Sequence, residues 1–127
     1  MCAGGIPTKN KTNALDCVQA AIKMQQYMIK RYQDKKRSGI PYWQMRIGIH
    51  TGPLVAGVVG KDKIAYDIWG DTVNLAKRME EAAHTDMINI SKETNELVSS
   101  EYSTSSRGKV AIKNDLLKEM FTVDYLD

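Results

Sequence analysis

The stretch that decides the fold of this chain is residues 66–80, YDIWGDTVNLAKRME. A run of strand-favouring residues stops at a glycine and an aspartate, and a helical pattern of apolar residues begins directly after them. We therefore predict a strand over residues 63–69, a turn, and a helix over residues 71–83 with Asp71 or Thr72 as its N-cap. A strand that turns directly into a helix is a common place for functional side chains.

The predicted helix carries Asn74 and Arg78 four positions apart. This spacing puts an amide and a guanidinium on one face of the helix, one turn apart. A permanently charged guanidinium beside a hydrogen-bonding amide suits an oxyanion or a phosphate. The same spacing is typical of a solvated surface helix, and spacing alone favours that second interpretation.

The hydrophobic pattern predicts the other elements and an α/β fold with a mixed sheet. A long helix begins near Asn13, ends through the cations of residues 35–37, and has one apolar face made of Leu15, Val18, Ile22, Ile29 and Tyr32. Strands are predicted over residues 45–50 and 87–91, a short helix over 92–99, and a closing hairpin from 107–112 and 121–125. Residues 1–6 read as the end of a strand, 52–60 as a loop or a strand at an edge, and 101–106 as a polar loop.

Composition limits the possible classes of protein. The chain has 127 residues, 43% of them hydrophobic, which indicates one domain or part of one. A net charge of +3 is too small to indicate a nucleic-acid partner, and the two cysteines form neither a disulfide framework nor a zinc site. The longest uncharged stretch, residues 47–60, is too short to span a bilayer. We expect a cytoplasmic segment without membrane contact, in which His50, His84 and Cys17 are structural.

Three short motifs suggest other functions, and each is weak. Residues 52–57 have the two glycines of a phosphate-binding P-loop but lack the lysine and hydroxyl that must follow. Residues 57–60 match the GxxG loop of an RNA-binding KH module, yet two valines occupy its middle. The basic run over residues 30–37 is more typical of a solvated helix end than of a nucleic-acid patch.

Two blocks carry a specific resemblance: residues 46–60, RIGIHTGPLVAGVVG, and residues 66–79. Together they resemble the class III nucleotidyl cyclase catalytic domain, the family of adenylate and guanylate cyclases. The resemblance implies a ferredoxin-like mixed sheet with flanking helices, in which the family's N-terminal strand and first helices are missing. Residues 1–127 would then be a partial catalytic domain. The family's two Mg²⁺ or Mn²⁺ ions are held by aspartates that align before Met1, as does an adenine-reading lysine, so we expect no metal ligand in this chain.

Roles for five residues follow from this resemblance. Asp67 matches the position that accepts the amino group of adenine, where guanylate cyclases have Cys or a small polar residue. The backbone of Ile68 and Trp69 lines the base pocket in the family. Asn74 matches the asparagine that orients the ribose. Arg78 matches the arginine that stabilises charge on the α-phosphate as pyrophosphate leaves.

Lys113 matches the lysine that binds the terminal phosphates, although the family continues there with Gly-Lys-Gly and this chain continues with Asn114-Asp115-Leu116. The implied reaction converts ATP to 3′,5′-cyclic AMP and pyrophosphate, in a site shared by two cyclase domains of a homodimer. A guanylate cyclase and a catalytically silent cyclase-like module, which binds nucleotide or dimerises, stay open as alternatives. An RNA-binding α/β module is a more distant one.

Overall fold

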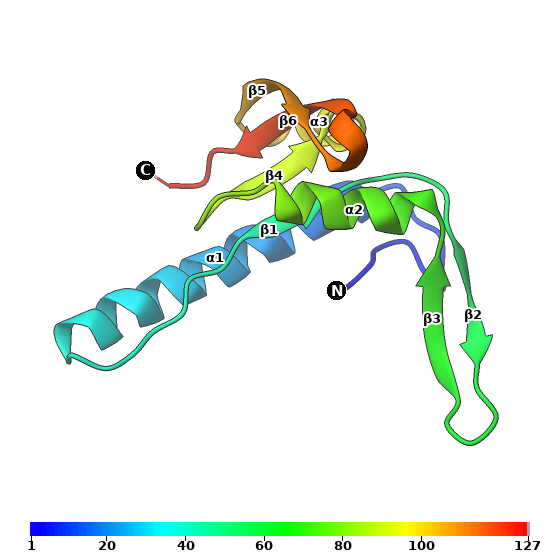
Figure 1. The fold of residues 1–127 in the computed structure, drawn as a ribbon, viewed down its shortest axis with the longest axis horizontal. Helices are drawn as coiled ribbons and strands as arrows, with labels where there is room; N and C mark the ends of the chain where they lie inside the picture. Colours follow the sequence, from blue (N-terminus) through cyan, green and yellow to red (C-terminus); the bar gives the residue numbers. More distant parts are fainter. Residues whose placement is uncertain (127) are drawn as a thin grey trace.

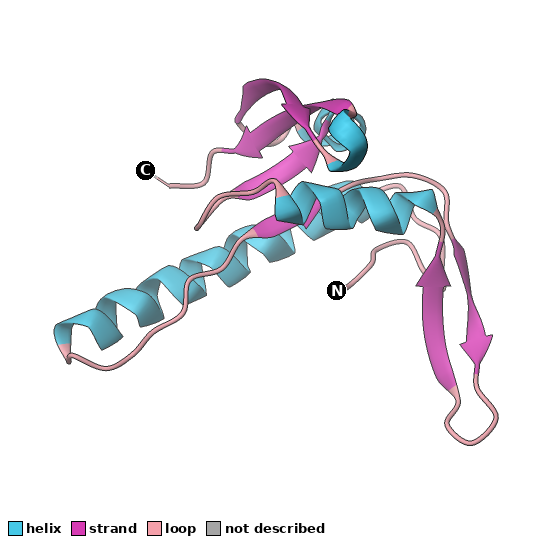
Figure 2. Cartoon of the chain, in the orientation of Figure 1, coloured by secondary structure: helices cyan, strands magenta, loops and turns pink. Residues whose placement is uncertain are grey.

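The computed structural model describes residues 1–126 as a four-stranded sheet flanked by helices, with a separate two-stranded hairpin (Figures 1 and 2). In chain order the elements are α1 (Asn13–Arg37), β1 (Ile47–Ile49), β2 (Val55–Val59), β3 (Ala65–Trp69), α2 (Asp71–Glu81), β4 (Ile88–Ser91), α3 (Lys92–Val98), β5 (Thr104–Ala111), the 3₁₀ turn η1 (Lys113–Asp115) and β6 (Leu117–Val123).

The sheet has the order β1-β4-β6-β5. β1 and β4 are parallel, whereas β4–β6 and β5–β6 are antiparallel pairs. This arrangement confirms the expected mixed sheet with flanking helices. All four residues of β4 are buried, which shows that elements cover this strand on both faces.

One face of the sheet supports the hydrophobic core, under α1 and α3. Ile88 and Ile90 of β4 are fully buried there with Val18 of α1 and Val98 of α3. Each such side chain contributes roughly 1.5–3 kcal/mol when it leaves water. Because side chains alternate along a strand, Asn89 points to the opposite face, where α2 lies.

Helix α1 packs through the predicted face, but a polar residue occupies a buried position in the middle of that face. Leu15, Val18 and Ile22 pack on the core as expected. The next buried position is Gln25, whose Nε2 donates to the carbonyls of Met45 (3.0 Å) and Met87 (3.2 Å). An amide therefore takes a core position because it satisfies two backbone carbonyls just before β1 and β4.

The predicted Ile29 and Tyr32 lie beyond the sheet, where the end of α1 projects from the body (Figure 1). There Tyr32 packs edge-on against Tyr42, with 4.4 Å between the ring centroids. Among the described residues, no helix is both long and apolar enough to cross a membrane.

The hairpin β2–β3 extends away from the sheet (Figures 1 and 2). Residues 52–60, expected as a loop or an edge strand, supply β2, so the glycines of the GxxG motif lie in a strand and its turn.

Three expectations about individual elements and their boundaries were wrong. Residues 1–6 form no strand, β5 begins at Thr104 within the expected loop, and the N-cap of α2 is Gly70. Pairing with β6 makes the Ser/Thr-rich segment a strand, an effect of tertiary structure that local polarity does not reveal.

Candidate active site

Helix α2 starts where β3 ends, as residues 66–80 predicted. Gly70 has a φ of 127°, and its carbonyl accepts hydrogen bonds from the N–H groups of Val73 and Asn74. Thr72 does not cap the helix but is buried, and its hydroxyl donates to the carbonyl of Pro53. The residues before β2 therefore hold the first turn of α2.

Two glycines let β1 and the following loop approach α2 closely. A Cβ at Gly48 would lie 2.0 Å from the backbone nitrogen of Glu80, and one at Gly52 would lie 2.6 Å from Thr72 Oγ1. Any side chain at Gly48 would push α2 away from the sheet. The repeated glycines of residues 46–60 are the sequence signal for this contact.

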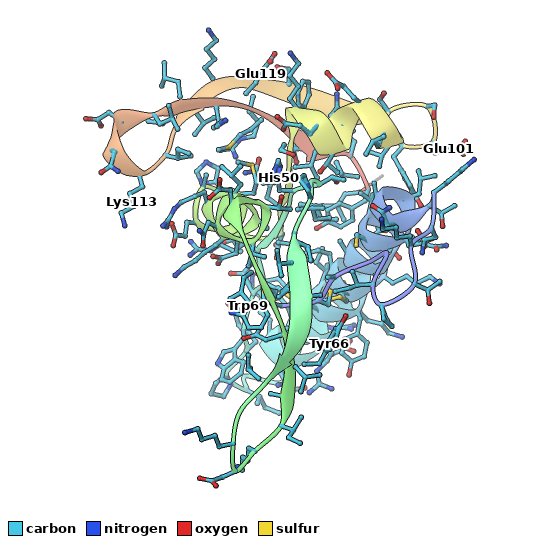
Figure 3. The ribbon with its side chains drawn as sticks, turned by 90° about the vertical axis from the view of Figure 1, so that its right-hand side faces the viewer. His50, Tyr66, Trp69, Glu101, Lys113 and Glu119 are labelled. Carbon is cyan, nitrogen blue, oxygen red and sulfur yellow. The ribbon has the colours of Figure 1, made fainter. Side chains whose placement is uncertain are left out.

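The predicted base-reading residues lie on β3. Asp67 is paired with Gly57 across the hairpin, and its Oδ1 accepts the N–H of Ile68 at 2.8 Å. Asp67 and Trp69 are exposed, whereas Ile68, on the other face of the strand, is half-buried. The ring of Trp69 lies over Gly57, 3.8 Å from where a Cβ would be. Figure 3 shows Trp69 on the β2–β3 hairpin, the projecting arm of the molecule, below α2.

Asn74 is exposed and lines an open cavity of about 820 Å³ between the N-terminal segment, α1, β1 and α2. Ile68, Lys77 and Glu80 line the same cavity. Apolar side chains of α1 and β1 line much of it, and α2 contributes Thr72, Asn74, Lys77 and Glu80. The structure thus brings Ile68 and Asn74 to one surface.

Arg78 lies one turn beyond Asn74, as predicted, but does not line that cavity. Its Nη1 lies 2.7 Å from Oε2 of Glu81, and its side chain is 23% exposed. The hydrogen bond from Arg78 lowers the pKa of Glu81 below its usual range. The guanidinium is therefore held by a carboxylate of its own helix, a contact that the sequence analysis missed although the i, i+3 spacing indicates it.

Lys113 is exposed at the turn between β5 and β6 and forms no ion pair within the described part of the chain. The next two residues, Asn114 and Asp115, have φ values of 64° and 58°. Asparagine and aspartate tolerate this left-handed region better than most residues, so they make a turn for which glycine is the usual choice. Figure 3 shows Lys113 at this turn, with α2 between it and the β2–β3 arm.

Of the candidate residues, only Ile68 and Asn74 line the cavity, whereas Asp67, Trp69, Arg78 and Lys113 do not. Asp67, Asn74 and Arg78 follow one another along the arm and α2, and Lys113 lies on a separate turn. Within residues 1–126, no three His, Cys, Asp or Glu side chains cluster in a way that could hold a metal ion. The described residues do not by themselves fit a pair of catalytic metal ions.

His50 has the structural role expected for it. Its Nδ1 lies 2.8 Å from the hydroxyl of Ser91, the N-cap of α3, and 3.8 Å from Glu93. Only 8% of its side chain is exposed, and this burial lowers the pKa of His50. His50 thus joins the end of β1 to the start of α3 (Figure 3).

The fold agrees with comparisons to known proteins. The family model described as "Adenylate and Guanylate cyclase catalytic domain" matches residues 1–124. The chain is 39% identical over 121 residues to "Guanylyl cyclase, membrane" of Dictyostelium discoideum, covering 94% of this chain, and 31% identical over 113 residues to "Adenylate cyclase" of Mycobacterium tuberculosis, covering 89%. The crystal structure of the adenylyl cyclase CyaB from P. aeruginosa superposes with a TM-score of 0.87 over 98% of this chain, at 30% identity.

These matches establish a class and then a family. The fold is that of nucleotide cyclase domains, and the chain belongs to the adenylate and guanylate cyclase catalytic domain family. The expected resemblance is confirmed. The chain spans 8% of the Dictyostelium relative, 25% of the Mycobacterium relative and 66% of the solved CyaB chain.

Proposed function

We propose that this chain is the nucleotide-reading and transition-state half of an adenylate cyclase site, which forms 3′,5′-cyclic AMP and pyrophosphate from ATP. The observation that carries the proposal is the order of Asp67, Asn74 and Arg78 along β3 and α2, with the side chains of Asp67 and Asn74 both exposed. A carboxylate that can accept a hydrogen bond from a base thus lies on β3, and a guanidinium that can bind a phosphate lies on α2, the element that follows.

The residues have distinct roles in this proposal. Asp67 accepts a hydrogen bond from the 6-amino group of adenine, and Asn74 orients the ribose. Arg78 meets the negative charge that develops on the α-phosphate, and Lys113 binds the terminal phosphates. In phosphoryl chemistry, positioning and charge stabilisation provide most of the rate acceleration.

A second cyclase domain completes the site in this proposal, as a homodimer. In the full-length protein, aspartates of that second domain that lie outside residues 1–127 would hold the Mg²⁺ or Mn²⁺ ions, since the described residues offer no cluster for them. The exposed apolar side chains on the projecting arm support such a contact, because exposed patches of this kind mark association surfaces. They are Val55, Val58, Val59, Ile64, Tyr66 and Trp69, each at least 40% exposed. We place this catalytic segment in the cytoplasm, whether or not the protein that contains it is anchored.

A guanylate cyclase is the second candidate, since relatives that carry either name match the chain. Assays of the full-length protein with ATP and with GTP, each with Mg²⁺ or Mn²⁺, separate the candidates by product. Cyclic AMP as the main product supports the proposal, and turnover of GTP alone, to cyclic GMP, contradicts it. If neither cyclic AMP nor cyclic GMP forms, the result supports a catalytically silent module. We expect this chain alone to form no product until a domain with metal-binding aspartates is added.

A further inference from the structure

Arg107 lies at an irregularity in the sheet. Ser106 pairs with Phe121 and Gly108 pairs with Met120, so Arg107 has no partner on β6. Gly108 has a φ of 71°, and its N–H donates to Ser106 Oγ at 3.1 Å. A β-bulge of this kind bends the strand and redirects the side chain of the extra residue.

The bulge directs Arg107 to the end of α2. Its Nη1 donates to the carbonyl of Ala82, the C-cap of α2, at 3.1 Å and to Oδ1 of Asn89 at 2.8 Å. Its Nη2 lies 3.5 Å from Nε2 of His84. In the part of the chain that the structure describes, no carboxylate lies within ion-pair distance of Arg107. The cation thus acts on the negative end of the α2 dipole.

Asn89 makes a second link to the same helix turn. It is fully buried on β4, and its Nδ2 donates to the carbonyl of Met79 at 2.8 Å while its Oδ1 accepts from Arg107. The carbonyls of Met79 and Ala82 both belong to the last turn of α2, whose final carbonyls have no partner within the helix. Two strands of the sheet therefore hold this turn through side chains.

The turn of α2 that Arg107 and Asn89 contact directly follows Arg78. Arg78 precedes Met79, and its own carbonyl accepts the N–H of Ala82 at 3.1 Å. A shift or rotation of the last turn would move the guanidinium of Arg78, and misplacement by about 1 Å can cost roughly 10²-fold in rate. We propose that Arg107, together with Asn89, is a positioning residue that holds Arg78 in place for the reaction. This inference rests on the proposed function.

A double-mutant cycle in the full-length protein tests this inference. We expect Arg78→Ala to lower kcat by ~10²–10³ and Arg107→Ala to lower it by roughly tenfold to a hundredfold, with little change in KM. Because Arg107 acts through Arg78, adding Arg107→Ala to Arg78→Ala should cost nothing further. Losses that multiply, or an unchanged kcat for Arg107→Ala, would overturn the inference.

Two further measurements separate positioning from general loss of structure. Arg107→Lys keeps the charge at the helix end but reaches fewer acceptors, so it should restore part of kcat. Amide hydrogen exchange in this chain should rise at residues 79–83 in Arg107→Ala and stay unchanged in the control Arg37→Ala, whose partner Asp34 lies at the far end of α1. Unchanged exchange at residues 79–83 would contradict the inference. An unaffected kcat in Arg78→Ala would instead contradict the proposed function. The exchange result would still show whether Arg107 holds the last turn of α2.

Discussion

Arg78 and Glu81 are paired within the last turn of α2, with Nη1 of the arginine 2.7 Å from Oε2 of the glutamate. The side chain proposed to meet a phosphate therefore has an internal anionic partner. A phosphate that binds Arg78 must compete with this carboxylate, which stays ionised because the hydrogen bond from Arg78 lowers its pKa.

Replacing Glu81 should make Arg78 more available. We expect Glu81→Gln to tighten binding of a non-cyclisable nucleotide analogue by about two- to fivefold at low salt, the size of an exposed ion pair. Titration calorimetry measures this, with Glu96→Gln on α3 as the control. The gain should shrink at high salt, because salt screens the competing pair. Equal affinities for Glu81→Gln and the control would show that Glu81 does not compete.

Arg78 itself should act on the transition state. We expect Arg78→Ala to lower kcat of the full-length protein by ~10²–10³ with little change in KM, because the guanidinium meets charge that develops during the reaction. Steady-state kinetics with ATP measure both constants, with Arg37→Ala as the control. A higher KM with an unchanged kcat would assign Arg78 to ground-state binding instead.

Asp67 should determine the choice of base. A carboxylate accepts from the 6-amino group of adenine, whereas guanine places a carbonyl oxygen there and leaves two acceptors opposed. We expect Asp67→Cys to raise the use of GTP relative to ATP, mostly by weakening ATP. Competition kinetics with both nucleotides give the ratio of kcat/KM. An unaltered ratio would mean that Asp67 does not read the base.

Gly48 should be essential for stability, because a Cβ there would overlap the backbone of Glu80. We expect Gly48→Ala to lower the free energy of unfolding by about 3 kcal/mol. Gly57→Ala is the matched control, since a Cβ at that strand position has its nearest neighbour at 3.8 Å. Urea unfolding followed by circular dichroism compares the two, and equal losses would contradict the close approach of β1 and α2.

His50 should make stability depend on pH. Burial lowers its pKa in the folded state below 6.5, so the unfolded state binds more protons as the pH falls. Its contribution is complete above about pH 6.5 and is lost progressively below it. We expect the unfolding temperature to fall less between about pH 7 and about pH 5 in His50→Asn than in the unmutated chain. Parallel curves for the two proteins would contradict this.

The sequence alone determined the elements that local pattern specifies. The strand, glycine turn and helix of residues 66–80 were predicted because β-favouring residues, a glycine and a 3.6-residue period succeed one another within one short stretch. The same stretch, with residues 46–60, carried the family resemblance that the comparisons confirmed. The spacing of Asn74 and Arg78 on one helix also follows from local geometry.

Tertiary structure decided what depends on partners distant in sequence. The Ser/Thr-rich start of β5 is a strand only because β6 pairs with it, and the bulge at Arg107 exists only within that pair. Gln25 and Asn89 are polar residues at buried positions because backbone carbonyls from other elements accept their hydrogen bonds. Such contacts join residues 10 to 62 positions apart, so hydrophobic period and local propensity, which report on neighbours along the chain, do not contain them.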